Sequence, residues 1–149
     1  MTAIANDLSI DRIAPRAVSR YATTAARILL GLTFFVTGLN GVIPFLPPPS
    51  PDAMPAGAMD LMIGLVKSGY MLPLIAITQL LGGALLLSNR FVPLALTILA
   101  PVLVNIIAFH VFLAPQGLPI AIAVVALEIY LAIVHRNAFR SIIAASSRG

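Results

Sequence analysis

The sequence predicts an all-α protein: a transmembrane four-helix bundle with a short amphipathic surface helix in its first extracytoplasmic loop. Hydrophobic residues make up 60% of the chain and charged residues only 9%, whereas soluble domains carry about 25% charged residues. A chain of 149 residues also has too little interior to bury so much apolar surface as a soluble monomer. Finally, four long apolar runs are flanked by arginines, which is typical of membrane proteins.

Each of the four apolar runs is near the roughly 20 residues that a helix needs to cross the hydrocarbon layer. The spans are predicted at about residues 24–43, 70–87, 91–114 and 118–134. The first run is too long for the apolar region of a typical signal peptide, so we expect an uncleaved helix. The predicted organisation is a polar N-terminal segment (1–22), a four-helix membrane domain (23–136) and a tail (137–149).

The loop after the first span has two distinct parts. Residues 44–55 contain six prolines, which preclude a regular helix and favour extended backbone. Apolar residues then recur at helical spacing, which predicts a helix that lies on the bilayer surface or caps the bundle. Its apolar face is Ala58, Leu61, Met62, Leu65 and Val66. Further along, Pro101 lies inside the third span and should kink it.

The basic residues predict the orientation of the bundle. Of the nine Lys and Arg residues, only Lys67 belongs to the first loop, and the third loop has none. The other eight lie in the N-terminal segment, at the start of the first span, in the second loop or after the fourth span. The positive-inside rule therefore predicts that both termini lie in the cytoplasm.

A few polar side chains interrupt the spans, and such residues usually face the bundle interior or a cavity. At a rise of about 1.5 Å per residue, Gln79 and Glu128 lie roughly 15 and 12 Å from the inner ends of their spans. Asn40, Asn105 and His110 lie at roughly 24, 21 and 28 Å. The sequence thus predicts an inner Gln79/Glu128 pair and an outer Asn40/Asn105/His110 group, and these five residues are the candidate ligand-binding residues.

Several kinds of chemistry find no support in the sequence. The chain has no cysteine, which removes disulfides, thiolate metal sites and iron–sulfur clusters. His110 and His135 differ in depth by roughly 25 Å, so one haem cannot bridge them within a chain. We predict no metal site, no built-in cofactor, no catalytic residue set and no nucleic-acid partner. For Gln79 and Asn105, a hydrogen bond to a neighbouring helix is the simpler interpretation; direct roles for Glu128 and His110 stay open.

An ordered set of short motifs covers about residues 24–140. The motifs include Ala-Arg-Ile-Leu-Leu-Gly-Leu (26–32), Thr-Gly-Leu-Asn-Gly (37–41), Gln-Leu-Leu-Gly-Gly (79–83), Asn-Arg-Phe-Val-Pro-Leu (89–94), Ala-Pro-Val-Leu-Val-Asn (100–105), Phe-His-Val-Phe-Leu (109–113) and Leu-Glu-Ile-Tyr-Leu (127–131). In these motifs the chain resembles the DoxX-like family of small four-helix integral membrane proteins. The resemblance implies a bundle in the cytoplasmic membrane and a link to quinone, because the family takes its name from a membrane subunit of a thiosulfate:quinone oxidoreductase.

We therefore expect an accessory subunit of a membrane redox system that contacts quinone, rather than an enzyme in its own right. Its partners would be the lipid bilayer and membrane or redox proteins, or further copies of the same chain. One alternative is a structural or interaction subunit that packs against other membrane proteins without its own ligand; Gly31, Gly38, Gly82 and Gly83 would then serve packing. A second alternative is a carrier of small solutes or lipids.

Overall fold

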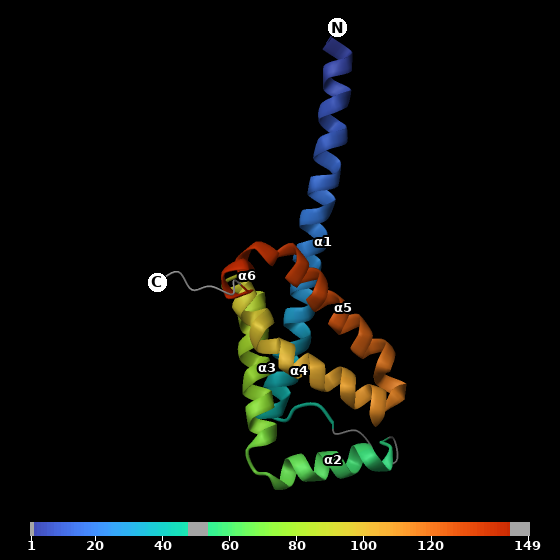
Figure 1. Ribbon diagram of the computed structural model, residues 1–149, viewed down its shortest axis with the longest axis vertical. Helices are drawn as coiled ribbons and strands as arrows, with labels where there is room; N and C mark the ends of the chain where they lie inside the picture. Colours follow the sequence, from blue (N-terminus) through green and yellow to red (C-terminus); the bar gives the residue numbers. More distant parts are fainter. Residues whose placement is uncertain (1, 48–53, 144–149) are drawn as a thin grey trace.

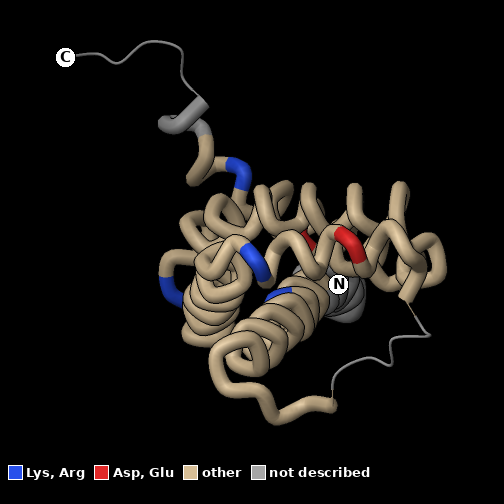
Figure 2. Tube along the Cα trace, turned by 90° about the horizontal axis from the view of Figure 1, so that it is seen from below, with Lys and Arg blue, Asp and Glu red and all other residues tan. Residues whose placement is uncertain are grey.

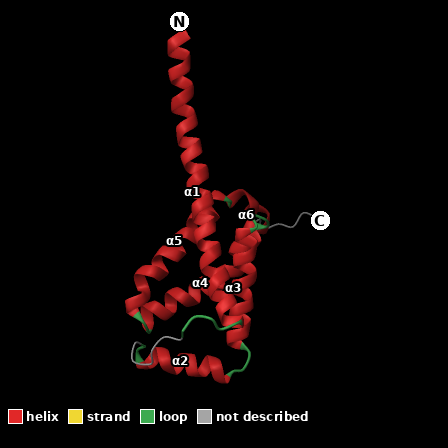
Figure 3. Ribbon diagram, turned by 180° about the vertical axis from the view of Figure 1, so that it is seen from behind, coloured by secondary structure: helices red, strands yellow, loops and turns green. Residues whose placement is uncertain are grey.

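Helices make up all of the regular secondary structure in the described residues. The computed structural model describes residues 2–47 and 54–143, and in these residues it shows helices joined by loops, with no strand (Figure 1, Figure 3). The elements are α1 (Thr2–Val42), α2 (Ala56–Lys67), α3 (Met71–Leu87), α4 (Val92–Phe112), the 3₁₀ helix η2 (Pro115–Gly117), α5 (Leu118–Val134) and α6 (Arg136–Ile143). The predicted all-α class is confirmed.

The lengths and surfaces of these helices fit a membrane. In the part of the chain that is described, three segments are long and apolar enough to cross it: Ser19–Val42, Val92–Phe112 and Pro115–Val134. The fourth candidate, α3, meets the same criterion together with α2, from which it is bent by 92°. Its 17 residues correspond to about 26 Å of helix, close to the hydrocarbon thickness of about 30 Å. The transmembrane bundle is therefore confirmed.

Large apolar side chains cover the outside of the bundle. Val104 and Ile120 are 64% and 73% exposed, and many other Leu, Ile and Val side chains are also exposed. Charged positions are few along the helices (Figure 2). In water such a surface would be an aggregation liability, whereas in a bilayer it contacts lipid tails. The chain is a multi-pass membrane protein.

Glycines bring α1 and α3 into close contact. A Cβ atom at Gly38 would overlap the backbone of Leu80, and one at Gly83 would overlap the backbone of Phe35. Small residues of this kind let transmembrane helices approach until their backbones touch. Gly31 packs against Leu86 and Leu87, and Gly82 against Leu99. All four glycines therefore serve packing within the chain.

The core lies where α1, α3, α4 and α5 meet. Its largest fully buried side chains are Leu30, Phe34, Leu86, Leu99 and Leu131. One end of the bundle is also held by polar contacts, because Nη1 of Arg27 donates to the carbonyl oxygens of Leu86 and Leu87. Carbonyls in the last turn of a helix lack partners within the helix, so Arg27 caps α3 from α1. The hydroxyl groups of Thr23 on α1 and Tyr130 on α5 form a hydrogen bond of 3.0 Å.

Two helical segments were not anticipated. The sequence predicted a polar segment for residues 1–22, yet α1 extends back to Thr2 and projects beyond the bundle (Figure 1). Alanine, leucine and arginine in this stretch favour helix. In the predicted tail, α6 spans Arg136–Ile143. Part of the proline-rich connector (48–53) and the end of the tail (144–149) lie outside the described residues.

Candidate functional site

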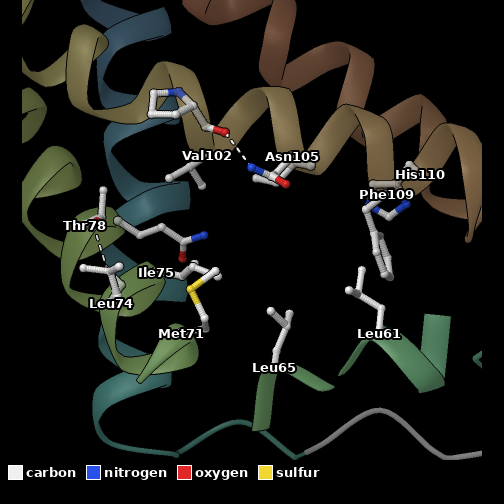
Figure 4. A pocket seen from close by; sticks show the side chains of 13 residues that line it. Leu61, Leu65, Met71, Leu74, Ile75, Thr78, Val102, Asn105, Phe109 and His110 are labelled. Carbon is white, nitrogen blue, oxygen red and sulfur yellow. Dashed lines mark hydrogen bonds between the residues drawn. The ribbon is translucent and has the colours of Figure 1, made fainter. Parts of the chain in front are cut away.

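A cavity of about 370 Å³ lies between α2, α3 and α4. It forms because α2 turns by 92° from α3 and lies across the end of the bundle (Figure 1). The predicted apolar face of α2 supplies one wall, with Leu61 and Leu65 opposite Asn105 and Phe109 of α4 (Figure 4). The remaining lining residues are Met71, Leu74, Ile75, Thr78, Gln79, Pro101, Val102, Ile106 and His110. The cavity is mainly apolar with a few polar side chains.

Three of the five candidate ligand-binding residues meet in this cavity. Gln79 reaches it from α3, while Asn105 and His110 reach it from α4. The predicted grouping had placed Gln79 with Glu128 instead. Pro101 lies inside α4, and this helix bends along its length, so that its second half extends over α2 (Figure 1). Thr78, which sequence reasoning missed, also lines the cavity; its position next to Gln79 was the available signal.

His110 is held firmly at one end of the cavity. Its Nδ1 atom lies 3.0 Å from the carbonyl oxygen of Ala114. Because a carbonyl oxygen only accepts, Nδ1 carries the hydrogen, and Nε2 is the hydrogen-bond acceptor of the neutral ring. Phe109 packs edge-to-face against the ring, with centroids 5.2 Å apart. On another side a Cβ atom at Gly117 would overlap the ring, so the position of His110 depends on η2.

The other polar side chains of the cavity bond to their own helices. The Nδ2 atom of Asn105 donates to the carbonyl oxygen of Pro101 at 3.2 Å. The Thr78 hydroxyl donates to the carbonyl oxygen of Leu74 at 2.8 Å. These bonds use one donor of each side chain, so that Asn105 keeps its Oδ1 atom and one amide hydrogen and Thr78 keeps only its acceptor lone pairs.

Asn40 does not line the cavity. Its Oδ1 atom accepts hydrogen bonds from the backbone N–H groups of Phe45 at 3.0 Å and Leu46 at 2.8 Å. Asn40 therefore closes the end of α1 and holds the turn that follows it. The outer Asn40/Asn105/His110 group is thus divided, because only Asn105 and His110 share a site.

Glu128 lies apart from the cavity as well. It is a buried residue of α5, 8% exposed, and within the described residues its Oε2 atom has no hydrogen-bond partner. No hydrogen bond between Gln79 and Glu128 is present in the same part of the chain. An unpaired polar atom at such a position is costly.

The sequence profile of the DoxX family matches residues 22–113 of the chain. The chain belongs to the DoxX family. The matched region contains every residue of this DoxX protein that lines the cavity, from Leu61 to His110. Glu128 and the Gly117 contact to His110 lie beyond it. No curated protein and no solved structure matches this DoxX protein, so its cavity is interpreted from its own residues.

The described part of the DoxX protein holds no group of three or more His, Asp or Glu residues that could bind a metal ion. His110 and His135 each direct Nδ1 to a backbone carbonyl, of Ala114 and Leu131 respectively. The cavity itself is half open and presents hydrogen-bonding side chains among apolar ones.

Proposed function

We propose that this DoxX protein is an accessory subunit of a membrane redox system and that it binds a quinone in the cavity between α2, α3 and α4. The observation that carries the proposal is the convergence of Gln79, Asn105 and His110 on one apolar cavity. Small-molecule sites are typically cavities of about 300–1,000 Å³ with apolar walls and a few well-placed polar groups. The accessory role is what membership of the family implies.

The lining residues suit the head group of a quinone. Among the described residues, those that line the cavity include no Lys, Arg, Asp or Glu, which favours a neutral ligand over an anion or cation. A quinone ring is flat and apolar with oxygen atoms at opposite edges. Phe109, Leu61 and Leu65 would enclose the ring, and the amides of Gln79 and Asn105 would donate to its oxygens. The apolar tail would lie among lipid chains.

When bound, the quinone would supply a carrier of two electrons and two protons to the partner enzyme. The residues of this chain would bind the ring, orient it and exclude water. Such a role requires no catalytic residue in the chain itself. Quinones dissolve in the bilayer, so the exposed apolar faces of α3 and α4 are compatible with entry from lipid.

Titration of the purified protein in nanodiscs with decylubiquinone tests the proposal. We expect saturable binding at one site. Replacement of Gln79 by Leu removes a hydrogen bond and should weaken binding by about 2–10-fold, since a hydrogen bond contributes about 0.5–1.5 kcal/mol. Glu128→Gln is the matched control, because it alters a buried polar side chain outside the cavity, and its affinity should equal that of the parent. Non-saturable binding, or equal effects of the two variants, would contradict the quinone site.

The accessory role requires a partner, which purification from the native membrane in mild detergent can reveal. We expect mass spectrometry to identify a redox enzyme among the copurified proteins. Recovery of non-redox membrane proteins alone, together with unsaturable quinone binding, would favour the structural alternative.

We further propose that both termini lie in the cytoplasm, with the chain in the inner membrane. The support is the distribution of arginines, because Arg90 lies between α3 and α4 and Arg136 follows α5. The chain has no cysteine, so single cysteines can be introduced at Ser68 and Ser88. In intact cells an impermeant thiol reagent should modify the cysteine at position 68 and spare that at position 88. The reverse pattern would invert the topology.

A further inference from the structure

The polar side chains of the cavity offer more hydrogen-bond acceptors than donors. Three of these side chains donate a hydrogen bond to a backbone carbonyl oxygen: Thr78, Asn105 and His110. Thr78 and neutral His110 are then left with acceptors alone, whereas Asn105 keeps one amide hydrogen. Gln79 is the fourth polar side chain of the cavity and contributes both a donor and an acceptor. Acceptor atoms are thus available on all four side chains, but donors on only two.

This asymmetry distinguishes the two redox forms of a quinone. The carbonyl oxygens of the oxidised form only accept hydrogen bonds, so they can use only the amides of Gln79 and Asn105. The hydroxyl groups of the reduced form donate as well as accept. A quinol can therefore donate to Nε2 of His110 or Oγ1 of Thr78, which the oxidised form would leave without a partner. Unpaired polar atoms next to a bound ligand weaken binding.

The contacts that create the asymmetry are built into the fold. The hydrogen on Nδ1 of His110 is directed to the Ala114 carbonyl, and the ring lies against Gly117, so it cannot turn freely to present Nδ1. The bonds of Thr78 and Asn105 each join residues four apart on one helix. A fixed set of acceptors selects for a donor-bearing ligand without any reorganisation on binding.

We propose that the cavity is selective for the reduced, hydroxyl-bearing form of a lipid-soluble quinone. This proposal rests on the proposed function and adds the redox form of the ligand. The protein would therefore hold quinol rather than quinone, whether the quinol comes from an enzyme that forms it or passes to one that oxidises it.

The test compares three ligands that share the same ring substituents and tail under anaerobic conditions: decylubiquinol, decylubiquinone and the bis-methyl ether of decylubiquinol, which is bulkier by two methyl groups. We expect the quinol to bind about tenfold more tightly than the quinone, which corresponds to about 1.4 kcal/mol. The ether has the quinol's electronic structure but no hydroxyl hydrogen, and it should bind no better than the quinone. Binding is measured in nanodiscs, so no catalytic activity is needed.

The variant His110→Phe should reduce the tenfold preference to about twofold or threefold, by loss of one hydrogen bond. Equal or tighter binding of the quinone by the parent protein would overturn the selectivity while the quinone site itself stands. Absence of saturable binding by all three ligands would instead reject the proposed function. The comparison of the three ligands in the parent protein tests the selectivity without any variant. The test therefore stands even where His110→Phe fails to fold.

Discussion

Replacement of Gly83 by Ala is expected to destabilise the bundle by about 2 kcal/mol, because overpacking against an unyielding neighbour costs about 1–3 kcal/mol. A Cβ atom at this position would overlap the backbone N of Phe35, and it would lie 2.8 Å from the Phe35 Cα atom and 2.9 Å from the Gly31 carbonyl oxygen. These are backbone atoms of α1, which cannot rotate away as the end of a side chain can. The two helices must therefore separate along their contact.

Gly64→Ala is the matched control for this substitution. Gly64 lies within α2, and a Cβ atom there would meet nothing within 4 Å. Alanine also favours helix over glycine by about 1 kcal/mol, so this variant should be as stable as the parent or slightly more stable. Both are compared by unfolding in detergent, with size-exclusion chromatography to check monodispersity. Equal stabilities of the two variants would show that the backbones of α1 and α3 do not approach each other as closely at Gly83 as they do in the structure.

The helices of the bundle could be predicted well from the sequence. The span predicted at 118–134 coincides with α5, and that predicted at 91–114 exceeds α4 by one or two residues at each end. Long apolar runs bounded by Ser-Asn-Arg and Pro-Gln-Gly leave little freedom, because the bilayer fixes the length. The extension of α1 and the short α6 could not be predicted in this way, since no apolar run marks them.

The composition of the site was harder to predict, for a geometric reason. Depth estimates treat each helix as straight and perpendicular to the membrane, and on that basis Gln79 and Asn105 differed by roughly 6 Å. Gln79 and Asn105 nevertheless line one cavity, so depths estimated for straight helices do not decide which side chains meet. The direction in which Pro101 bends α4 depends on tertiary packing, which the sequence does not display.

Glu128 shows the second limit of sequence reasoning. Its depth was close to that of Gln79, but a contact also requires that both side chains face each other. The α5 segment Leu118–Val134 is apolar on every side except at Glu128 and Tyr130, so no polar stripe indicates how the helix is rotated about its axis. The rotation is set by packing on α1 and α4, and it leaves Glu128 outside the cavity.

Replacement of Gly117 by Ala is expected to displace the His110 ring, and through it to alter the cavity. A Cβ atom at Gly117 would overlap Cε1 and Nδ1 of the ring and lie 3.1 Å from Nε2. The backbone is not the obstacle, since Gly117 has φ −90° and ψ −3°, which any residue adopts. The three heavy atoms nearest to that Cβ position all belong to the ring. The ring would have to give up its hydrogen bond to Ala114.

A double-mutant cycle isolates this contact. Gly117→Ala alone should destabilise the protein by about 1–3 kcal/mol through overpacking. It should also weaken quinol binding by about three- to fivefold, because the displaced Nε2 atom no longer accepts the hydrogen bond. In the His110→Ala background the ring is gone, so Gly117→Ala should have almost no effect on either quantity. The coupling energy between the two positions is the measured difference. Equal effects of Gly117→Ala in both backgrounds would mean that His110 is not positioned by η2, and the fixed acceptor at the end of the cavity would lose its structural basis.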